Sequence, residues 1–272
     1  MRLEREPAVA GRFYAANPRQ LEADVGAFIG DAGTARPAKA LVGPHAGYVY
    51  SGPVAGRGYQ EVSVPGTVIV LGPNHTGLGP RYSIWPQGTW CMPGEDVKVD
   101  DRLATVILER ARAAGVPLQA DDAAHLHEHS IEVHLPFLRA RRRDVTIVPI
   151  CLSRLTWREC ENLGRALAAA IDDRDGILIV ASTDMSHYVS AQVANELDHL
   201  ALERIESLDP EGLLGVVTEH DISMCGVVPT AVALVTALEL GATSSHVAAY
   251  GNSGETSGNF GRVVGYASAV VR

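Results

Sequence analysis

Short runs of β-branched and aliphatic residues alternate along this chain with longer segments in which apolar residues recur at helical spacing. The short runs predict strands at residues 39–43, 67–72, 145–150, 177–182 and 263–271. The longer segments predict helices at about 18–30, 53–61, 100–114, 129–142, 156–172, 190–207 and 227–240. Such alternation is typical of an α/β protein with a mainly parallel central sheet flanked by helices. Because no linker or repeat interrupts the pattern, we expect a single domain over residues 1–272.

The composition supports one large folded domain and narrows the range of partners. The 272 residues are 46% hydrophobic and 20% charged, which is enough to bury a sizeable core. A formal net charge of −9 argues against nucleic acid or an anionic membrane surface as the main partner. The one locally basic run, residues 139–143, ends a predicted helix, where cations interact favourably with the helix dipole.

The cysteines and the first residues indicate a reducing compartment. The four cysteines, at positions 91, 151, 160 and 225, show no CxxC spacing, so neither a disulfide scaffold nor a zinc ribbon is indicated. The first residues have no apolar stretch of signal-peptide length, and no apolar run reaches the roughly 18 residues of a membrane span. We therefore expect a cytoplasmic protein that binds no membrane and no nucleic acid.

Polar side chains that can bind metals follow three of the predicted strands. His45 and His75 each come after a strand, behind a Gly-Pro pair that stops it, and Asp184 and His187 follow a third strand. In an open parallel sheet, ligands bind beyond the carboxyl ends of the strands, which meet at one edge. One histidine after a strand is more often a hydrogen-bonded loop residue than a ligand. Three such strand ends favour a shared site.

Cys225 is a further candidate because it stands just before the helix predicted at 227–240. A helix N-terminus carries partial positive charge, which makes a thiol there easier to ionise and more available to a metal. A lone cysteine is otherwise most often a small buried apolar residue, and Cys91, Cys151 and Cys160 are interpreted that way.

The segment His125–Leu138 is the densest polar cluster in the sequence. It does not match the H-E-x-x-H helix of zinc proteases, because the residue four positions after His127 is an isoleucine. On a helix, Glu128 and Glu132 would share one face, with His129 beside them. We expect these residues to cap the helix or to hydrogen-bond metal ligands rather than to bind a metal directly.

Aromatic residues near these positions are candidates for the wall of a pocket. Trp85 and Trp90 lie in a loop-like stretch with little core to fill, which favours a place in a pocket wall. Three tyrosines that follow the histidines could stack on an aromatic substrate or cover the sheet edge, namely Tyr48, Tyr50 and Tyr188.

Six ordered stretches resemble the MEMO family, whose bacterial and archaeal members are called AmmeMemoRadiSam system protein B. They are VAGRFYAANPRQL, GPHAGYVYSG, VLGPNHTG, EHSIEVHLPFL, STDMSHY and MCGVVPTA, and they span nearly the whole chain. The resemblance implies a fold similar to class III extradiol dioxygenases, which hold non-haem iron between two histidines and a carboxylate. It makes His45 and His75 the histidine ligands and puts Cys225 at the carboxylate position. It also gives His187 the place of the acid/base histidine. The residues themselves support Asp184 as the group that orients His187.

This ligand set leaves three functions open. Two histidines and a thiolate are softer than the dioxygenase set, so we expect a transition metal, iron or copper before zinc. The first function is a metal-dependent redox enzyme of the dioxygenase type that acts on a small-molecule substrate. The second is iron or copper handling, or support of a radical-SAM protein, as the family name implies. The third is a ligand- or peptide-binding module that uses a vestigial active-site pocket. The complete residue set favours the first two, and no sequence feature names the substrate.

Overall fold

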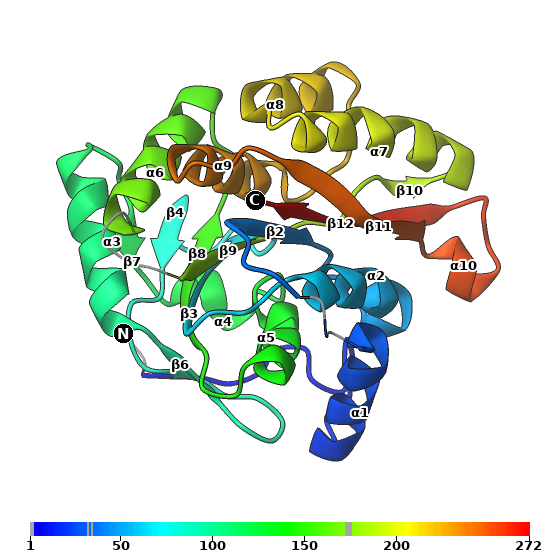
Figure 1. The fold of residues 1–272 in the computed structure, drawn as a ribbon, viewed down its shortest axis with the longest axis horizontal. Coiled ribbons are helices and arrows are strands. Elements are labelled where there is room, and N and C mark those ends of the chain that lie inside the picture. Colours follow the sequence, from blue (N-terminus) through cyan, green and yellow to red (C-terminus); the bar gives the residue numbers. More distant parts are fainter. Residues whose placement is uncertain (1–2, 32, 34, 172–175) are drawn as a thin grey trace.

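The computed structural model describes residues 3–31, 33, 35–171 and 176–272, and its centre is a block of four parallel strands (Figure 1). In sheet order these are β8 (Thr146–Leu152), β3 (Thr67–Pro73), β9 (Ile177–Ser182) and β2 (Ala40–Gly43). Aliphatic side chains point to both faces of these strands, and nearly all of their residues are buried. A sheet of this kind requires helices on both sides.

Further strands extend the block at both edges into one sheet, which has twelve strands within the described residues. On the β2 side, β12 (Val263–Val271) runs antiparallel to β2, and β11 (Ser245–Asn252) and β10 (His187–Val189) run antiparallel to β12. On the β8 side lie the short strands β6 (Val97–Val99), β5 (Thr89–Trp90), β1 (Glu4–Arg5), β4 (Tyr82–Ile84) and β7 (Gln119–Ala120). The sheet is therefore mixed, with its parallel part at the centre.

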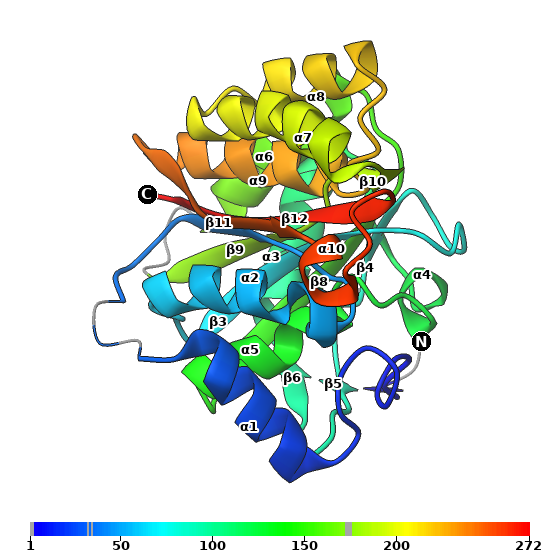
Figure 2. The same ribbon diagram turned by 90° about the vertical axis from the view of Figure 1, so that its right-hand side faces the viewer.

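Helices cover the two faces of the sheet as separate layers (Figure 2). One layer consists of α3 (Asp101–Ala113), α6 (Trp157–Ile171), α7 (Ala191–Glu206), α8 (Pro210–Glu219) and α9 (Val227–Glu239). The other consists of α1 (Pro18–Ile29), α2 (Tyr48–Glu61), α5 (Leu135–Arg141) and the 3-10 helix Glu132–His134. Two short helices, α4 (Ala123–Leu126) and α10 (Gly254–Ser257), complete the set in the described chain. Each layer encloses its own apolar core against the sheet.

Capping residues explain where several helices begin. The side chain of Asn17 accepts hydrogen bonds from two backbone N–H groups in the first turn of α1. Asp100, Ser190 and Asp209 cap α3, α7 and α8 in the same way. Both α1 and α8 also begin with proline, at a position where the missing N–H has no partner in a helix anyway.

The α/β fold predicted from the sequence is confirmed, and all five predicted strands are present within about two residues of their expected ends. The helix expected at 53–61 begins earlier, at Tyr48, and contains Pro53. The helix expected at 129–142 is shorter, because a turn precedes the 3-10 helix and α5. The last residue of the helix expected at 156–172 lies outside the described residues. Neither α8 nor β11 was predicted.

The prediction that Trp85 and Trp90 line a pocket is wrong. Both indoles are fully buried in the core on the α1, α2 and α5 side of the sheet, with their ring centroids 6.1 Å apart. Their stretch is not a loop without a core, because it forms β4 and β5 at the sheet edge. The Arg5 guanidinium carbon lies 4.1 Å from the centroid of the Trp90 ring, over its face.

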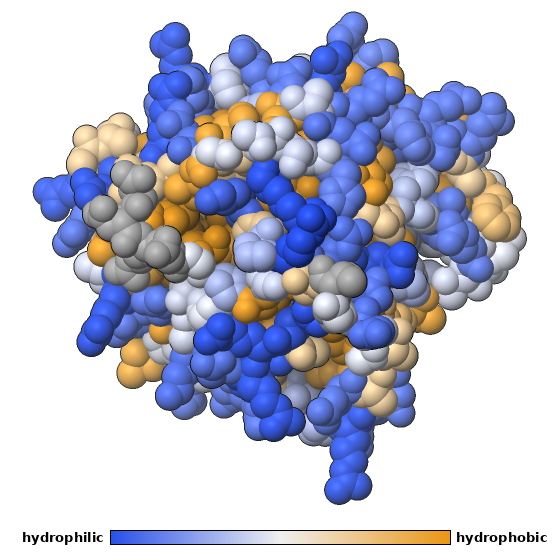
Figure 3. All heavy atoms as spheres, viewed as in Figure 1, coloured by the Kyte–Doolittle hydropathy of each residue, from blue (hydrophilic) through white to orange (hydrophobic). Residues whose placement is uncertain are grey.

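Hydrophilic side chains cover most of the face shown in Figure 3, with hydrophobic side chains in smaller patches between them. No helix within the described ranges combines the length and the apolar character needed to cross a membrane.

Candidate metal site

Three histidine rings meet at one edge of the sheet, beyond the carboxyl ends of its parallel strands. His45 follows β2, His75 follows β3, and His129 stands in the turn before the 3-10 helix. Because β2 and β3 both neighbour β9, the turns that leave them lie close together. Ring nitrogens of the three histidines all lie within 4.8 Å of one another, so the cluster could bind a metal. The predicted convergence of His45 and His75 is confirmed, and His129 joins them.

His45 is buried and is held at both its backbone and its ring. Its backbone N–H donates to Asp184 Oδ1 at 2.8 Å, and its Nδ1 lies 2.6 Å from Ser182 Oγ. Burial and the neighbouring histidines lower the pKa of His45 well below its ordinary value. The ring is therefore neutral at physiological pH, which is the form that binds metals.

His75 is held by a single carboxylate, Glu128. One carboxylate oxygen accepts the backbone N–H of His75 at 2.6 Å, and the other lies 2.9 Å from Nδ1. Burial opposes protonation of His75, but its hydrogen bond with Glu128 and the nearby carboxylate charges outweigh this and raise its pKa. For Glu128, burial alone would raise the pKa, but the hydrogen bond and the charge interaction with His75 outweigh burial and lower the pKa to about 2. An ionised carboxylate only accepts, so Nδ1 carries the proton and Nε2 is left for a ligand.

His129 stacks on His75 and meets His45 edge-on. The His129 and His75 ring centroids are 4.8 Å apart with nearly parallel planes, and the distance to the His45 centroid is 5.3 Å. Its backbone N–H donates to Glu128. Burial lowers the pKa of His129, which again favours the neutral ring.

His129 was not predicted as a ligand, because the sequence pattern placed it on a helix. In the structure the helix begins later, and the intervening turn brings the ring to the cluster. The hydrogen-bonding role expected for this segment is confirmed for Glu128. Glu132 has a structural role instead, accepting from Arg5, Tyr14 and two backbone N–H groups of the N-terminal segment.

Cys225 lies beside His45, as predicted, just before α9. Its Sγ is 3.2 Å from His45 Nε2, whereas a sulfur and a nitrogen on one tetrahedral zinc ion would be roughly 3.5 Å apart. The expectation that the helix N-terminus eases ionisation of the thiol is wrong. Burial and the charge of Asp184 raise the pKa of Cys225 above its ordinary value. Binding of Cys225 to a metal stays a prediction.

His187 and Asp184 each hydrogen-bond another residue, whereas the sequence analysis expected Asp184 to orient His187. His187 donates its backbone N–H to Ser223 Oγ at 2.7 Å, and its Nδ1 lies 2.9 Å from the Ser223 carbonyl oxygen. The buried Asp184 carboxylate instead accepts the backbone N–H of His45. Burial raises the pKa of Asp184, and this hydrogen bond partly opposes the shift. Ser223 therefore orients His187, whose acid/base role stays a prediction.

The donor groups fit a transition-metal ion. Three imidazoles cluster here, and a thiol and a carboxylate lie beside His45, with Cys225 Sγ 3.2 Å and Asp184 Oδ2 4.0 Å from His45 Nε2. Nitrogen and sulfur donors suit iron, copper or zinc rather than magnesium or calcium, which prefer oxygen. The same set admits each of these three metals.

The three tyrosines differ in their surroundings. Tyr48 is buried, and its hydroxyl donates to the Val133 carbonyl oxygen, so it belongs to the core. Tyr50 and Tyr188 are exposed, and Tyr188 has a positive φ of 61°, which is uncommon for a residue other than glycine. Of the three, only Tyr50 and Tyr188 have rings that a ligand could contact.

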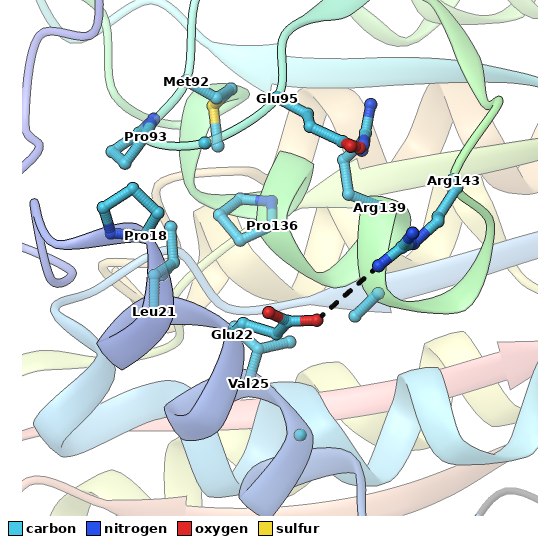
Figure 4. Close-up of a pocket in the computed structure, with 13 residues that line it drawn as sticks. Pro18, Leu21, Glu22, Val25, Met92, Pro93, Glu95, Pro136, Arg139 and Arg143 are labelled. Carbon is cyan, nitrogen blue, oxygen red and sulfur yellow. Dashed lines mark ion pairs between the residues drawn. The ribbon is translucent and has the colours of Figure 1, made fainter.

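A separate surface pocket of about 400 Å³ lies between α1, α5 and the 92–95 segment (Figure 4). Apolar side chains such as Pro18, Met92 and Pro136 form part of its wall, and Arg143 at its rim lies 3.9 Å from Glu22. None of the residues that line it belongs to the histidine cluster. The pocket is therefore distinct from the candidate metal site.

Fold and site together define an α/β protein with a three-histidine cluster at the carboxyl edge of a mainly parallel sheet. A family model described as Memo-like protein matches residues 5–270, so the chain belongs to the Memo-like family. Among its relatives, a MEMO1 family protein of Aquifex aeolicus is 40% identical over 264 residues, covering 96% of this chain and 97% of the relative. A MEMO1 family protein of Methanothermobacter thermautotrophicus is 38% identical over 277 residues, covering 97% of this chain and 98% of the relative.

A solved structure shares the fold at much lower sequence similarity. It is the crystal structure of an uncharacterized protein from Escherichia coli K12, with a TM-score of 0.55 and 17% identity. The match covers 85% of this chain and 98% of that chain. This likeness concerns the fold alone.

Proposed function

We propose that this protein binds iron or copper through His45, His75 and Cys225 and uses the metal in redox chemistry on a small oxygenated molecule. One observation carries the proposal. His75 presents Nε2 because Glu128 holds its Nδ1, and the Nε2 of His45 lies 3.2 Å from the Cys225 sulfur. His45 thus lies beside both His75 and Cys225 at the sheet edge where α/β proteins bind their ligands, which supports this ligand set.

The chain would hold the ion from one side. Two strand-end turns and the segment before α9 supply the ligands, while His75 is 34% exposed and marks the side open to solvent. An open coordination side suits a catalytic centre better than a closed structural one. When bound, the ion would supply Lewis acidity and a change of oxidation state.

His187 is the proposed acid/base group. A carbonyl oxygen only accepts, so Nδ1 of His187 carries the proton that faces Ser223. Nε2 is then the ring nitrogen that could take up and return a proton during the reaction. Ser223 also fixes the backbone of His187, which keeps the ring in one orientation.

Metal analysis of protein purified without added metal tests the proposal. We expect iron or copper in the purified protein, and tight binding of Fe(II), Cu(I) or Cu(II) on anaerobic reconstitution. The His75→Ala variant should lose this binding, whereas His199→Ala, which changes an exposed histidine on α7, should keep it. A protein that takes up none of these ions, nor Zn(II), would sink the proposal.

The third ligand is tested by Cys225→Asp and by His129→Ala. A carboxylate in place of the thiol makes the ligand set harder, so Cys225→Asp should shift the preference toward Fe(II) and away from copper. If Cys225→Asp keeps the wild-type metal preference and His129→Ala loses metal binding, His129 is the third ligand and Cys225 is not a ligand.

Iron or copper handling, including delivery to a radical-SAM protein, is the second candidate function. The thiol supports it, because sulfur with imidazole suits Cu(I) as well as iron. Oxygen consumption with catechols separates the two functions. A yellow ring-opened product would decide for the enzyme, and a loaded protein that consumes no oxygen with any catechol would put metal handling first.

A further inference from the structure

We propose that Ser182, with His134 and Tyr59 behind it, holds His45 in the single tautomer that keeps the Nε2 lone pair facing the metal site. Ser182 and His134 are positioning residues, since they act through His45. The purpose of this arrangement rests on the proposed function. The proton arrangement itself is a property of the metal-free chain and can be measured there.

Ser182 is the junction of the hydrogen-bond network. Its Oγ lies 2.6 Å from the Ser130 carbonyl oxygen, 2.6 Å from His45 Nδ1 and 3.0 Å from His134 Nε2. Ser182, Ser130, His45 and His134 are all buried. Within the described structure, the Ser182 hydroxyl therefore forms its hydrogen bonds with other protein groups.

The hydrogen-bond donors and acceptors around Ser182 allow a single arrangement of the protons on Ser182, His45 and His134. The Ser130 carbonyl can only accept, so the one hydroxyl proton of Ser182 goes to it. The two lone pairs of the hydroxyl oxygen then accept from the two rings. His45 must carry its proton on Nδ1 and His134 must carry one on Nε2.

The chain of hydrogen bonds continues to Tyr59. With its proton on Nε2, neutral His134 has a lone pair on Nδ1, which lies 3.0 Å from the Tyr59 hydroxyl. Tyr59 is fully buried and its ring stacks on Phe137 with a centroid distance of 5.1 Å. The Tyr59 hydroxyl therefore donates its proton to His134 Nδ1, so every proton of this hydrogen-bond network has a defined acceptor.

The opposite tautomer of His45 would break this network. With the proton on Nε2, Nδ1 of His45 would need the hydroxyl proton of Ser182, and the buried Ser130 carbonyl would lose its donor. The Nε2–H would then point at Cys225 Sγ, which is 3.2 Å away, and would occupy the ligand position. The network therefore does for His45 what the Glu128 carboxylate does for His75.

The pairing of β9 with β2 positions the residues of this network. Ser182 is the last residue of β9 and pairs in register with Gly43, the last residue of β2, two positions before His45. Gly43 lies against His134, because a Cβ at this position would sit 3.2 Å from His134 Cε1. The two strand ends thus set the distance between Ser182 and both rings.

The test is NMR of the full-length, metal-free protein with ¹⁵N-labelled histidines, recording two-bond couplings within each ring to assign the tautomers. We expect wild-type His45 to have Nδ1 protonated and Nε2 unprotonated. In Ser182→Ala, His45 should lose this single tautomer, and the affinity for Co(II) should fall roughly 10- to 100-fold. Ser268→Ala removes another buried hydroxyl with one hydrogen bond, to Val54, and should change neither result.

Two results would overturn the inference. One is wild-type His45 with its proton on Nε2, which requires no variant and so does not depend on how Ser182→Ala folds. The other is a Ser182→Ala variant that keeps the wild-type tautomer of His45 and its Co(II) affinity. Ser182→Thr keeps the hydroxyl, so it should restore both readouts. A wild-type protein that shows the expected tautomer but binds no metal would refute the proposed function and leave this inference standing.

Discussion

The Glu128 side chain hydrogen-bonds several parts of the candidate site. Its two carboxylate oxygens accept hydrogen bonds from the backbone and the ring of His75 and from the backbone N–H groups of His129 and Ser130. The side chain is 1% exposed, so none of these hydrogen bonds competes with bulk water. One buried carboxylate therefore fixes the positions of two of the three clustered histidines.

We expect Glu128→Gln to weaken metal binding roughly 10- to 100-fold, because an amide can no longer accept from all of these donors. The free energy of unfolding should fall by about 1–3 kcal/mol, since buried N–H groups lose their acceptor. Co(II) titration and urea unfolding of the metal-free protein measure the two effects.

Glu61→Gln is the matched control, because Glu61 also binds a histidine, His246, at 2.8 Å, but is 36% exposed. An exposed pair of this kind contributes only about 0–1 kcal/mol, and its loss should leave Co(II) affinity unchanged. Equal effects of Glu61→Gln and Glu128→Gln on affinity would contradict the role assigned to Glu128.

Among the elements, α1 and α2 show how glycine sets a helix crossing. A Cβ added at Gly56 of α2 would lie 2.3 Å from the Phe28 carbonyl oxygen of α1, a contact that only backbone movement could relieve. Gly215 of α8 has nothing within 4 Å of such a Cβ. The two glycines therefore permit opposite predictions for the same substitution.

We expect Gly56→Ala to destabilise the protein by about 1–3 kcal/mol through overpacking of the α1–α2 contact. Gly215→Ala should stabilise it by about 0.5–1 kcal/mol, because alanine loses less backbone entropy when a helix forms. Urea unfolding of both variants measures these changes. Gly56→Ala with wild-type stability would show that α1 can shift away from α2 without cost.

The success of sequence reasoning varied with the type of element. The central strands were predicted well because β3, β8 and β9 are continuous apolar runs buried on both faces. β11 was missed because its sequence, SHVAAYGN, contains few β-branched residues and most of it is only partly buried. Its strand conformation comes from pairing with β12, which is a tertiary contact that no local pattern reveals.

At the scale of the whole molecule, the sheet topology made part of the site predictable. Parallel strands deliver their carboxyl ends to one edge, so His45 and His75 could be brought together from the sequence alone. Contacts from outside the sheet could not be predicted in the same way. The turn that carries His129 and the choice of Ser223 as partner of His187 depend on how distant segments pack.

Buried neutral histidines should also make the whole fold sensitive to acid. Burial lowers the pKa of both His125 and His134 to about 3, whereas in an unfolded chain a histidine has a pKa of about 6.5. Between these values the unfolded state binds a proton that the native state does not. Stability is therefore fully present above about pH 6.5 and is lost as the pH falls toward 3, by up to about 1.4 kcal/mol per pH unit for each histidine.

His125 allows this to be tested away from the candidate ligands. It is fully buried, and its Nε2 lies 2.9 Å from Ser83 Oγ. Replacing it in His125→Gln should lower stability at pH 7 but flatten the pH dependence, so that the deficit relative to wild type shrinks by about 1 kcal/mol per unit from pH 6 to pH 4. Urea unfolding of the metal-free protein at several pH values measures this, with the exposed His199→Ala as a control that should keep the wild-type slope. Parallel curves for His125→Gln and wild type would mean that His125 titrates in the folded protein as it does in the unfolded chain. Burial would then not keep this ring neutral.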